Sequence, residues 1–281
     1  MDLYRIVGES VLERFIRFFH EIPRFFRYAQ YRVLMHKSWV ALLFLVSALM
    51  MFVTKLFFKL FGTIDVTQAA VNYRLTGLIT FSVIVLGIYN NYRLFPRDYY
   101  VTRHFNSSPF LHVVMSGAIY SLTLFLLMVI MIIIKPINTD TTWFGVIFYS
   151  MMSLFFVITL SFLLGVIRML YAKLNQLFLI VSAITLLLLP VFYLPEKLSG
   201  VVKHLLMLNP LYYLVNGMQQ SVIVGHDAVN HLGYHLYFLC FMGLMVVFSF
   251  ALRDYVTQLK PNEHTQSGSK HIEKENDTVT E

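Results

Sequence analysis

The segment Leu189–Gly217, LPVFYLPEKLSGVVKHLLMLNPLYYLVNG, decides which helical architecture this chain can form. Its prolines prevent it from crossing a bilayer as one helix, and it is too apolar to be an ordinary loop. Apolar residues recur at helical spacing on both sides of Asn209 and Pro210, which predicts two short amphipathic helices that meet at a proline corner. These residues are Leu198, Val201, Val202, Leu205 and Leu206 before the corner, and Leu211, Leu214, Val215, Met218 and Val222 after it.

Each of these two helices is too short to span a bilayer. Irregular backbone is tolerated at membrane depth only against protein or a water-filled cavity. We therefore expect residues 195–224 to form a re-entrant hairpin that dips into the outer leaflet, packs against the spanning helices and shapes an exit. The alternative is a connector that lies on the membrane surface and has no role in passage.

The composition around the hairpin is that of an integral membrane protein. Of the 281 residues, 58% are hydrophobic and only 13% are charged, whereas soluble domains carry roughly 25% charged residues. A helix needs about 20 apolar residues to cross the hydrocarbon core. Six segments of this kind predict an all-α integral membrane fold with transmembrane helices at 39–61, 74–92, 111–134, 143–167, 175–194 and 233–252.

Two polar regions flank this predicted transmembrane domain, residues 39–252. Residues 1–38 carry an apolar stripe opposite a charged one, which predicts a cytoplasmic amphipathic helix in the membrane interface. Residues 253–281 are too polar to bury a core, so we expect a disordered cytoplasmic tail. Sixteen of the 22 Lys and Arg residues fall on the side of the two termini, which predicts that both termini are cytoplasmic. These cations flank apolar spans and form no basic domain, so nucleic acid is not an expected partner.

The predicted inner loop Leu94–Phe110, LFPRDYYVTRHFNSSPF, combines aromatic and charged residues in a short segment. Arg and Tyr are favoured anchors at protein interfaces, so the loop is a candidate docking site for another protein. The alternative is a loop that only carries the positive charge and aromatic belt typical of an inner membrane surface.

Two further sets of residues could contact a transported substrate. Tyr120, Tyr149, Tyr212 and Tyr213 fall within spans or the hairpin, where aromatic rings could stack against sugars; interfacial belts explain tyrosines equally well. Lys55 and Lys59 lie one helical turn apart near the outer end of the first span. They could meet a substrate phosphate, or they could extend to lipid headgroups as interfacial lysines commonly do.

The sequence offers no candidate catalytic or metal site. It lacks the phosphate-cradling G-x-x-x-x-G-K-[ST] loop and the H-E-x-x-H and G-x-S-x-G motifs. His226, Asp227, His231 and His235 lie close together in the sequence, but their spacing matches no established metal site. No acidic residue lies deep in a predicted span, whereas carriers driven by protons or sodium usually need one. We expect that the chain is not an enzyme and that transport, if this is its function, draws its energy from a partner.

The order of these features resembles the ABC-2 type permeases of polysaccharide exporters, in particular the teichoic acid translocation permeases of Gram-positive bacteria and their O-antigen relatives. The resemblance is most specific in LPEKLSGVVKHLLMLNPLYYLVNG, residues 194–217, and weaker in QYRVLMHKSWVALL, residues 30–43. Outside these segments, over residues 10–255, it rests on pattern and topology.

The resemblance implies a permease subunit in a bacterial plasma membrane, paired with a second permease subunit as a probable-by-family homodimer. A separate cytoplasmic ATPase would bind ATP and Mg, so the chain itself would hold no cofactor, and a lipid-linked polymer would pass between the permeases. The residues implied in coupling to the ATPase are Arg24, Arg27, Arg32, Phe95, Arg97, Asp98, Tyr100 and Arg103. Those implied along the path and exit are Lys55, Lys59, Tyr120, Tyr149, Asn209, Pro210, Tyr212 and Tyr213. The alternatives are a permease for drugs or lipids and, from other classes, a membrane-bound glycosyl or phosphate transferase or a scaffold.

Overall fold

The computed structural model describes residues 37–104, 109–136, 139–171, 173–193, 199–225 and 229–259, and these residues form helices joined by short connections. Most of the predicted interfacial region 1–38, and residues 260–281 of the predicted tail, lie outside the described residues. Within the described part of the chain there is no strand. The prediction of an all-α fold is therefore confirmed.

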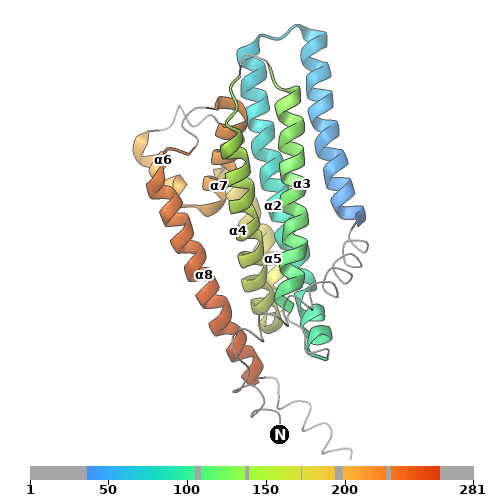
Figure 1. Cartoon of the computed structure of the whole chain (residues 1–281), viewed down its shortest axis with the longest axis vertical. Helices are drawn as coiled ribbons and strands as arrows, with labels where there is room; N and C mark the ends of the chain where they lie inside the picture. Colours follow the sequence, from blue (N-terminus) through green and yellow to red (C-terminus); the bar gives the residue numbers. More distant parts are fainter. Residues whose placement is uncertain are drawn as a thin grey trace, which may run out of the picture.

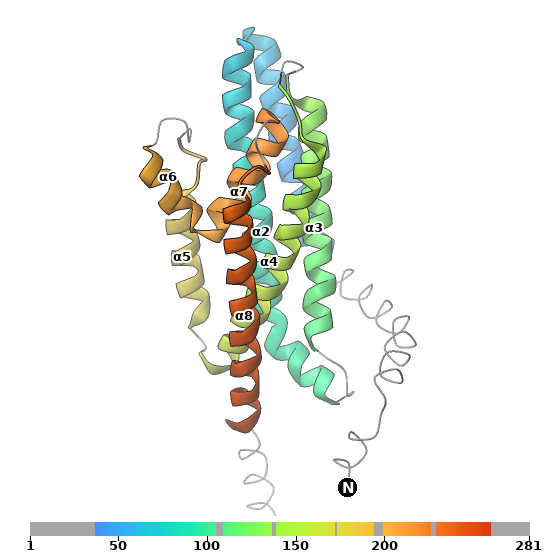
Figure 2. The same cartoon turned by 60° about the vertical axis from the view of Figure 1, so that its left-hand side comes forward.

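Five described helices are long and apolar enough to cross a membrane. They are the first helix Lys37–Phe61, α2 (Asp65–His104), α3 (Pro109–Ile134), α4 (Trp143–Leu170) and α8 (Leu232–Leu259). Helices α2, α3 and α4 pack against one another, and α8 packs on α4. The chain runs up the first helix, down α2, up α3, down α4, up the shorter α5 and down α8, so the described part begins and ends toward the same lower end of the bundle (Figures 1 and 2).

The predicted fifth span, 175–194, is shorter in the structure. Helix α5 (Leu174–Leu188) has 15 residues and is roughly 22 Å long, below the roughly 30 Å of a hydrocarbon core. It ends because Leu189 precedes Pro190 and adopts an extended conformation with a ψ of 153°. The six predicted spans thus correspond to five long helices and one short apolar helix.

The second predicted span, 74–92, belongs to the longest helix. Helix α2 has 40 residues and continues through the polar Asn90–Arg93 and most of the predicted loop 94–110. It does so because Asn91, Tyr92 and Phe95 are fully buried, and Phe95 packs among α3 and α4 side chains that include Phe162. Pro96 lies inside the helix, and the lower end of α2 turns away from the bundle axis (Figure 2).

The two predicted short helices of the hairpin are present and meet at the predicted corner. They are α6 (Gly200–Met207) and α7 (Pro210–Gln219). The Asn209 side chain accepts a hydrogen bond from the Leu211 N–H at 3.0 Å, and Pro210 occupies the first turn of α7, so this dipeptide starts the second helix. The α7 residues Tyr212–Gln219 are buried against α2 and α4, whereas Val201 and Leu205 of α6 remain exposed.

The hairpin ends in a π-helical turn, η3 (Gln220–Val224), that is fixed to the connection between α3 and α4. The Thr142 N–H donates to the Ser221 carbonyl at 2.9 Å, and the Thr141 hydroxyl donates to the Val222 carbonyl at 3.2 Å. Gly225 follows with a φ of 72°, where a side chain would be strained and a Cβ would also meet Asp140. These contacts hold the end of the hairpin at the upper end of the bundle.

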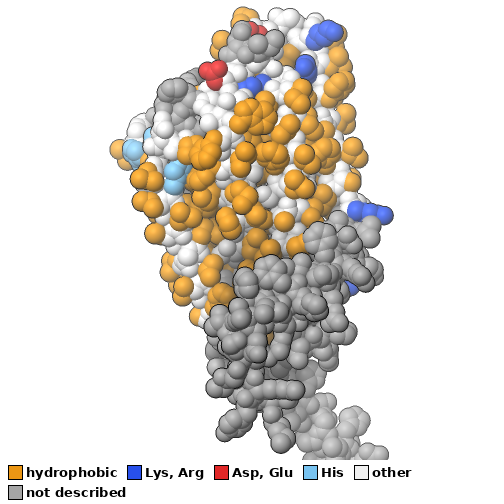
Figure 3. All heavy atoms as spheres, viewed as in Figure 1, with side chains coloured by type: hydrophobic (Ala, Val, Ile, Leu, Met, Phe, Trp, Pro, Cys, Tyr) orange, Lys and Arg blue, Asp and Glu red, His pale blue; other side chains and the backbone are white. Residues whose placement is uncertain are grey.

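The surface of the bundle is apolar over its middle. On the face seen in Figure 3, hydrophobic side chains form a broad band, and charged side chains gather above it at the upper end. The first helix and α8 contribute many exposed large hydrophobic residues to the surface. A band of this kind is typical of a protein surface that faces lipid or another membrane subunit.

Candidate functional site

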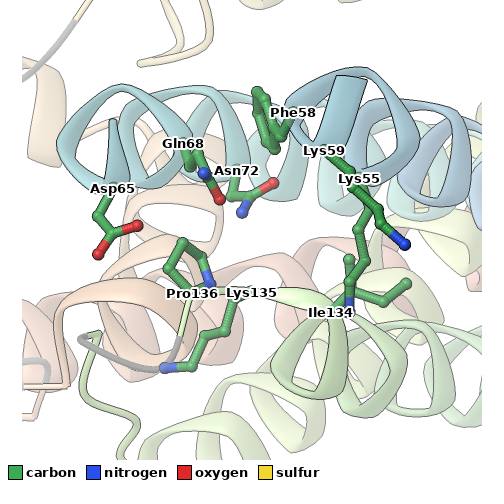
Figure 4. A pocket seen from close by; sticks show the side chains of 9 residues that line it. All are labelled: Lys55, Phe58, Lys59, Asp65, Gln68, Asn72, Ile134, Lys135 and Pro136. Atoms are coloured by element: carbon green, nitrogen blue, oxygen red, sulfur yellow. The ribbon is translucent and has the colours of Figure 1, made fainter. Parts of the chain in front are cut away.

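A pocket of about 520 Å³ opens at the upper end of the bundle, and we call it the upper pocket. The first helix contributes Lys55, Phe58 and Lys59, the start of α2 contributes Asp65, Gln68 and Asn72, and Lys135 follows the end of α3. In Figure 4, the two lysines of the first helix lie at one side of the pocket, Asp65 lies at the other, and the two amides lie between them. The structure thus brings the predicted pair Lys55 and Lys59 together with polar groups from two other helices.

A tight turn places these helices side by side. Gly62 ends the first helix with a φ of 56°, a conformation that favours glycine. The Gln68 amide donates to the Thr63 carbonyl at 2.8 Å, which ties the turn to α2. This turn makes the first helix antiparallel to α2 and directs Lys55 and Lys59 toward Asn72.

Lys135 is occupied by the protein itself. Its Nζ donates to the carbonyl oxygens of Thr139, Asp140 and Val222, at 2.9, 2.6 and 2.9 Å. Burial lowers the pKa of Lys135 from its ordinary value, and the nearby Asp140 carboxylate opposes the shift. Lys135 therefore fastens the end of α3 to the π-helical turn, and its three donors are already used.

Two buried amides join the hairpin to α2. The Tyr73 hydroxyl donates to the Asn216 side-chain oxygen at 2.9 Å, and the Gln219 amide donates to the carbonyls of Tyr73 and Pro190 at 2.9 and 3.0 Å. Gly77 permits this approach, since a Cβ there would lie 2.2 Å from Gln219 Nε2. Among the described residues, Asn216 Nδ2 and Gln219 Oε1 have no hydrogen-bond partner. The sequence interpretation missed both amides, although their polarity inside an otherwise apolar helix is a visible signal.

The four tyrosines predicted to line a path are all buried in the described chain: Tyr120, Tyr149, Tyr212 and Tyr213. Tyr149 and Tyr213 form an edge-to-face pair with ring centroids 5.5 Å apart. The Tyr213 hydroxyl bonds to His235 Nδ1, and His235 Nε2 donates to the Val229 carbonyl at 3.0 Å. These rings pack α4, α7 and α8 together and do not form the wall of an open path within this chain.

The lower end of α2 carries a basic, exposed face. Arg93, Arg97 and Tyr100 recur at helical spacing and are all exposed. Phe95 lies on the opposite side, where Gly165 leaves room for its ring: a Cβ on Gly165 would lie 2.4 Å from Phe95 Cγ. Of the predicted coupling residues, Arg97 and Tyr100 are therefore placed on a surface, and Phe95 is placed in the core.

The remaining predicted coupling residues are less fully described. Asp98 is partly buried. Arg103 belongs to α2, but its side chain lies outside the described part, as do Arg24, Arg27 and Arg32. His226 and Asp227 also lie outside it, and the described residues contain no group of three or more His, Cys, Asp or Glu that could hold a metal ion.

The described helices give this chain the character of a multi-pass helical membrane protein. The sequence matches no known family model and no curated protein. The arrangement of charged and polar groups in the helices must therefore carry any functional conclusion.

Proposed function

We propose that this chain is the transmembrane permease subunit of an ATP-driven ABC exporter, powered by a separate cytoplasmic ATPase. Its substrate is a lipid-linked cell-surface polymer, such as teichoic acid or a related polysaccharide. The complex contains two permease subunits in a bacterial plasma membrane, with the termini and the lower end of the bundle on the cytoplasmic side. The upper end and the hairpin then face outward, near the exit.

The observation that carries this proposal is the length and position of α2. Its 40 residues extend about 60 Å, roughly twice the thickness of a hydrocarbon core. One helix therefore joins the upper pocket at Asp65 to the exposed basic face at Arg97. Helix α7 packs on the same helix through Asn216 and Gln219, so a force on the lower end can reach the hairpin through continuous contacts.

Purification of the full chain in mild detergent from its source cells tests the proposal. We expect a nucleotide-hydrolysing chain to co-purify, and we expect depletion of this chain to stop the polymer from reaching the cell surface while its lipid-linked form accumulates inside. Normal surface polymer in depleted cells, or the consistent absence of an ATPase partner, would contradict the proposal.

Reversal of charge on the lower face of α2 should weaken the partner complex. For Arg97→Glu we expect roughly tenfold less ATPase in the purified complex, because exposed Arg anchors often dominate interface energy. Arg74→Glu is the matched control, since Arg74 is also exposed on α2 but lies toward its other end. Equal recovery of the ATPase with both variants would remove this face from the proposed interface.

Removal of the proline corner should uncouple export from assembly. The double variant Asn209→Ala, Pro210→Ala loses the helix cap at Leu211 and the fixed backbone of the corner, which costs about 1 kcal/mol for the cap alone. We expect surface polymer to fall severalfold while the ATPase still co-purifies. Unimpaired export by this variant would favour a passive connector.

A further inference from the structure

The upper pocket carries more positive than negative charge. Its lining contains Lys55, Lys59 and Lys135 against the single carboxylate of Asp65. Lys135 already donates to three carbonyl oxygens, which leaves the two ammonium groups of the first helix to face a ligand. Each of these groups has three N–H donors, and a phosphate oxygen is a strong acceptor for them.

The wall that holds these lysines is apolar on its adjacent face. An exposed stripe runs along the first helix beside Lys55 and Lys59 and continues from the pocket toward the middle of the bundle. The stripe consists of Leu45, Leu49, Phe52, Leu56 and Leu60. Lys55 and Leu56 are neighbours in sequence and lie about 100° apart around the helix, so a polar head at the lysine and an apolar chain at the leucine can belong to one molecule.

We infer that the upper pocket binds the phosphate head of a lipid, with Lys55 and Lys59 on the phosphate and the acyl chains along the apolar stripe of the first helix. The Asp65 carboxylate at the opposite side repels phosphate and so directs it toward the lysines. The Asn72 and Gln68 amides between the charges suit the polar remainder of the head. This binding uses only the first helix, α2 and α3, so it holds whether or not the chain is an exporter subunit.

A free anion and an unlocalised lipid contact are the competing sources of the same chemistry. A free phosphate would need the lysines but not the apolar stripe. Lysines that merely extend to headgroups would interact with many lipids without retaining one in a defined pocket. The probes must therefore vary the phosphate and the acyl chain separately.

Native mass spectrometry of the full chain in detergent, titrated with dioctanoyl phosphatidylglycerol, measures this binding. We expect one lipid to be retained per chain, roughly tenfold more weakly in the double variant Lys55→Gln, Lys59→Gln. The double variant Lys37→Gln, Lys173→Gln removes the same charge from two other exposed positions and should bind as the unmodified chain does. Lys55→Arg, Lys59→Arg keeps the charge and should retain the lipid.

Two further probes separate the sources. Dioctanoylglycerol has the same chains without phosphate and should not be retained, and inorganic phosphate should not displace the lipid at millimolar concentration. Displacement by inorganic phosphate would assign the pocket to a free anion. Retention of dioctanoylglycerol, or unchanged binding by the double glutamine variant with an unfolding midpoint equal to that of the unmodified chain, would overturn the inference.

Discussion

Replacing Gly217 by alanine will separate α7 from α4 and lower the free energy of unfolding by about 3 kcal/mol, at the upper end of the cost of overpacking a core. A Cβ at Gly217 would lie 2.1 Å from Tyr149 Cε1, far inside van der Waals contact. The Tyr149 ring has little room to move, since Phe148, Tyr213 and His235 surround it at centroid distances of 5.3 to 6.2 Å. Thermal unfolding of the purified chain in detergent measures the loss.

A matched glycine gives the control for this prediction. Gly243 lies inside α8, and a Cβ there would meet nothing within 4 Å, so Gly243→Ala should leave the unfolding midpoint unchanged or slightly raised. The double variant Gly217→Ala, Tyr149→Ala should be less destabilised than the sum of its single changes, because the smaller side chain leaves space for the new methyl group. Strict additivity would show that the Tyr149 ring is not what resists the substitution.

Replacing Lys135 by methionine should have a comparable effect on the upper end of the bundle. It removes the donor shared by the carbonyls of Thr139, Asp140 and Val222, and hydrogen bonds to charged groups contribute about 1.5 to 3 kcal/mol each. Water reaches part of this region, so we expect a net loss of about 3 kcal/mol in the free energy of unfolding. The same unfolding measurement applies, together with faster hydrogen exchange in η3.

The control for this change is another lysine at a connection between helices. Lys173→Met alters an exposed side chain at the start of α5 and should change stability by less than about 0.5 kcal/mol. If the Lys135 and Lys173 variants unfold together, the three carbonyls do not depend on Lys135 for their stability.

Local sequence signals predicted the helices well where periodicity and proline position determine them. The stripe Leu214, Val215 and Met218 is buried as predicted, and α7 begins at Pro210. The end of α5 was placed too late because apolar composition was given more weight than Pro190. The lower part of α2 was predicted as a loop because its polarity is local, whereas the burial of Asn91 and Phe95 depends on distant residues in α3 and α4.

The candidate sites were only partly predictable for the same reason. Lys55 and Lys59 were identified because their spacing places them on one helical face. Asp65, Asn72 and Lys135 joined them only through the turn at Gly62 and the packing of three helices, which no single segment encodes. The predicted path tyrosines are buried because α7 inserts between α2 and α4, an arrangement that follows from the whole bundle.

The continuity of α2 has a mechanical consequence. From Asp65 to Pro96 the described helix contains no proline at which it could flex, so the upper pocket and the last buried turn above the basic face move as one body. A tilt imposed at Arg97 can be absorbed only at Pro96 or passed along the whole rod. Pro96 is therefore the joint whose stiffness sets how much of a push at one membrane surface is felt at the other.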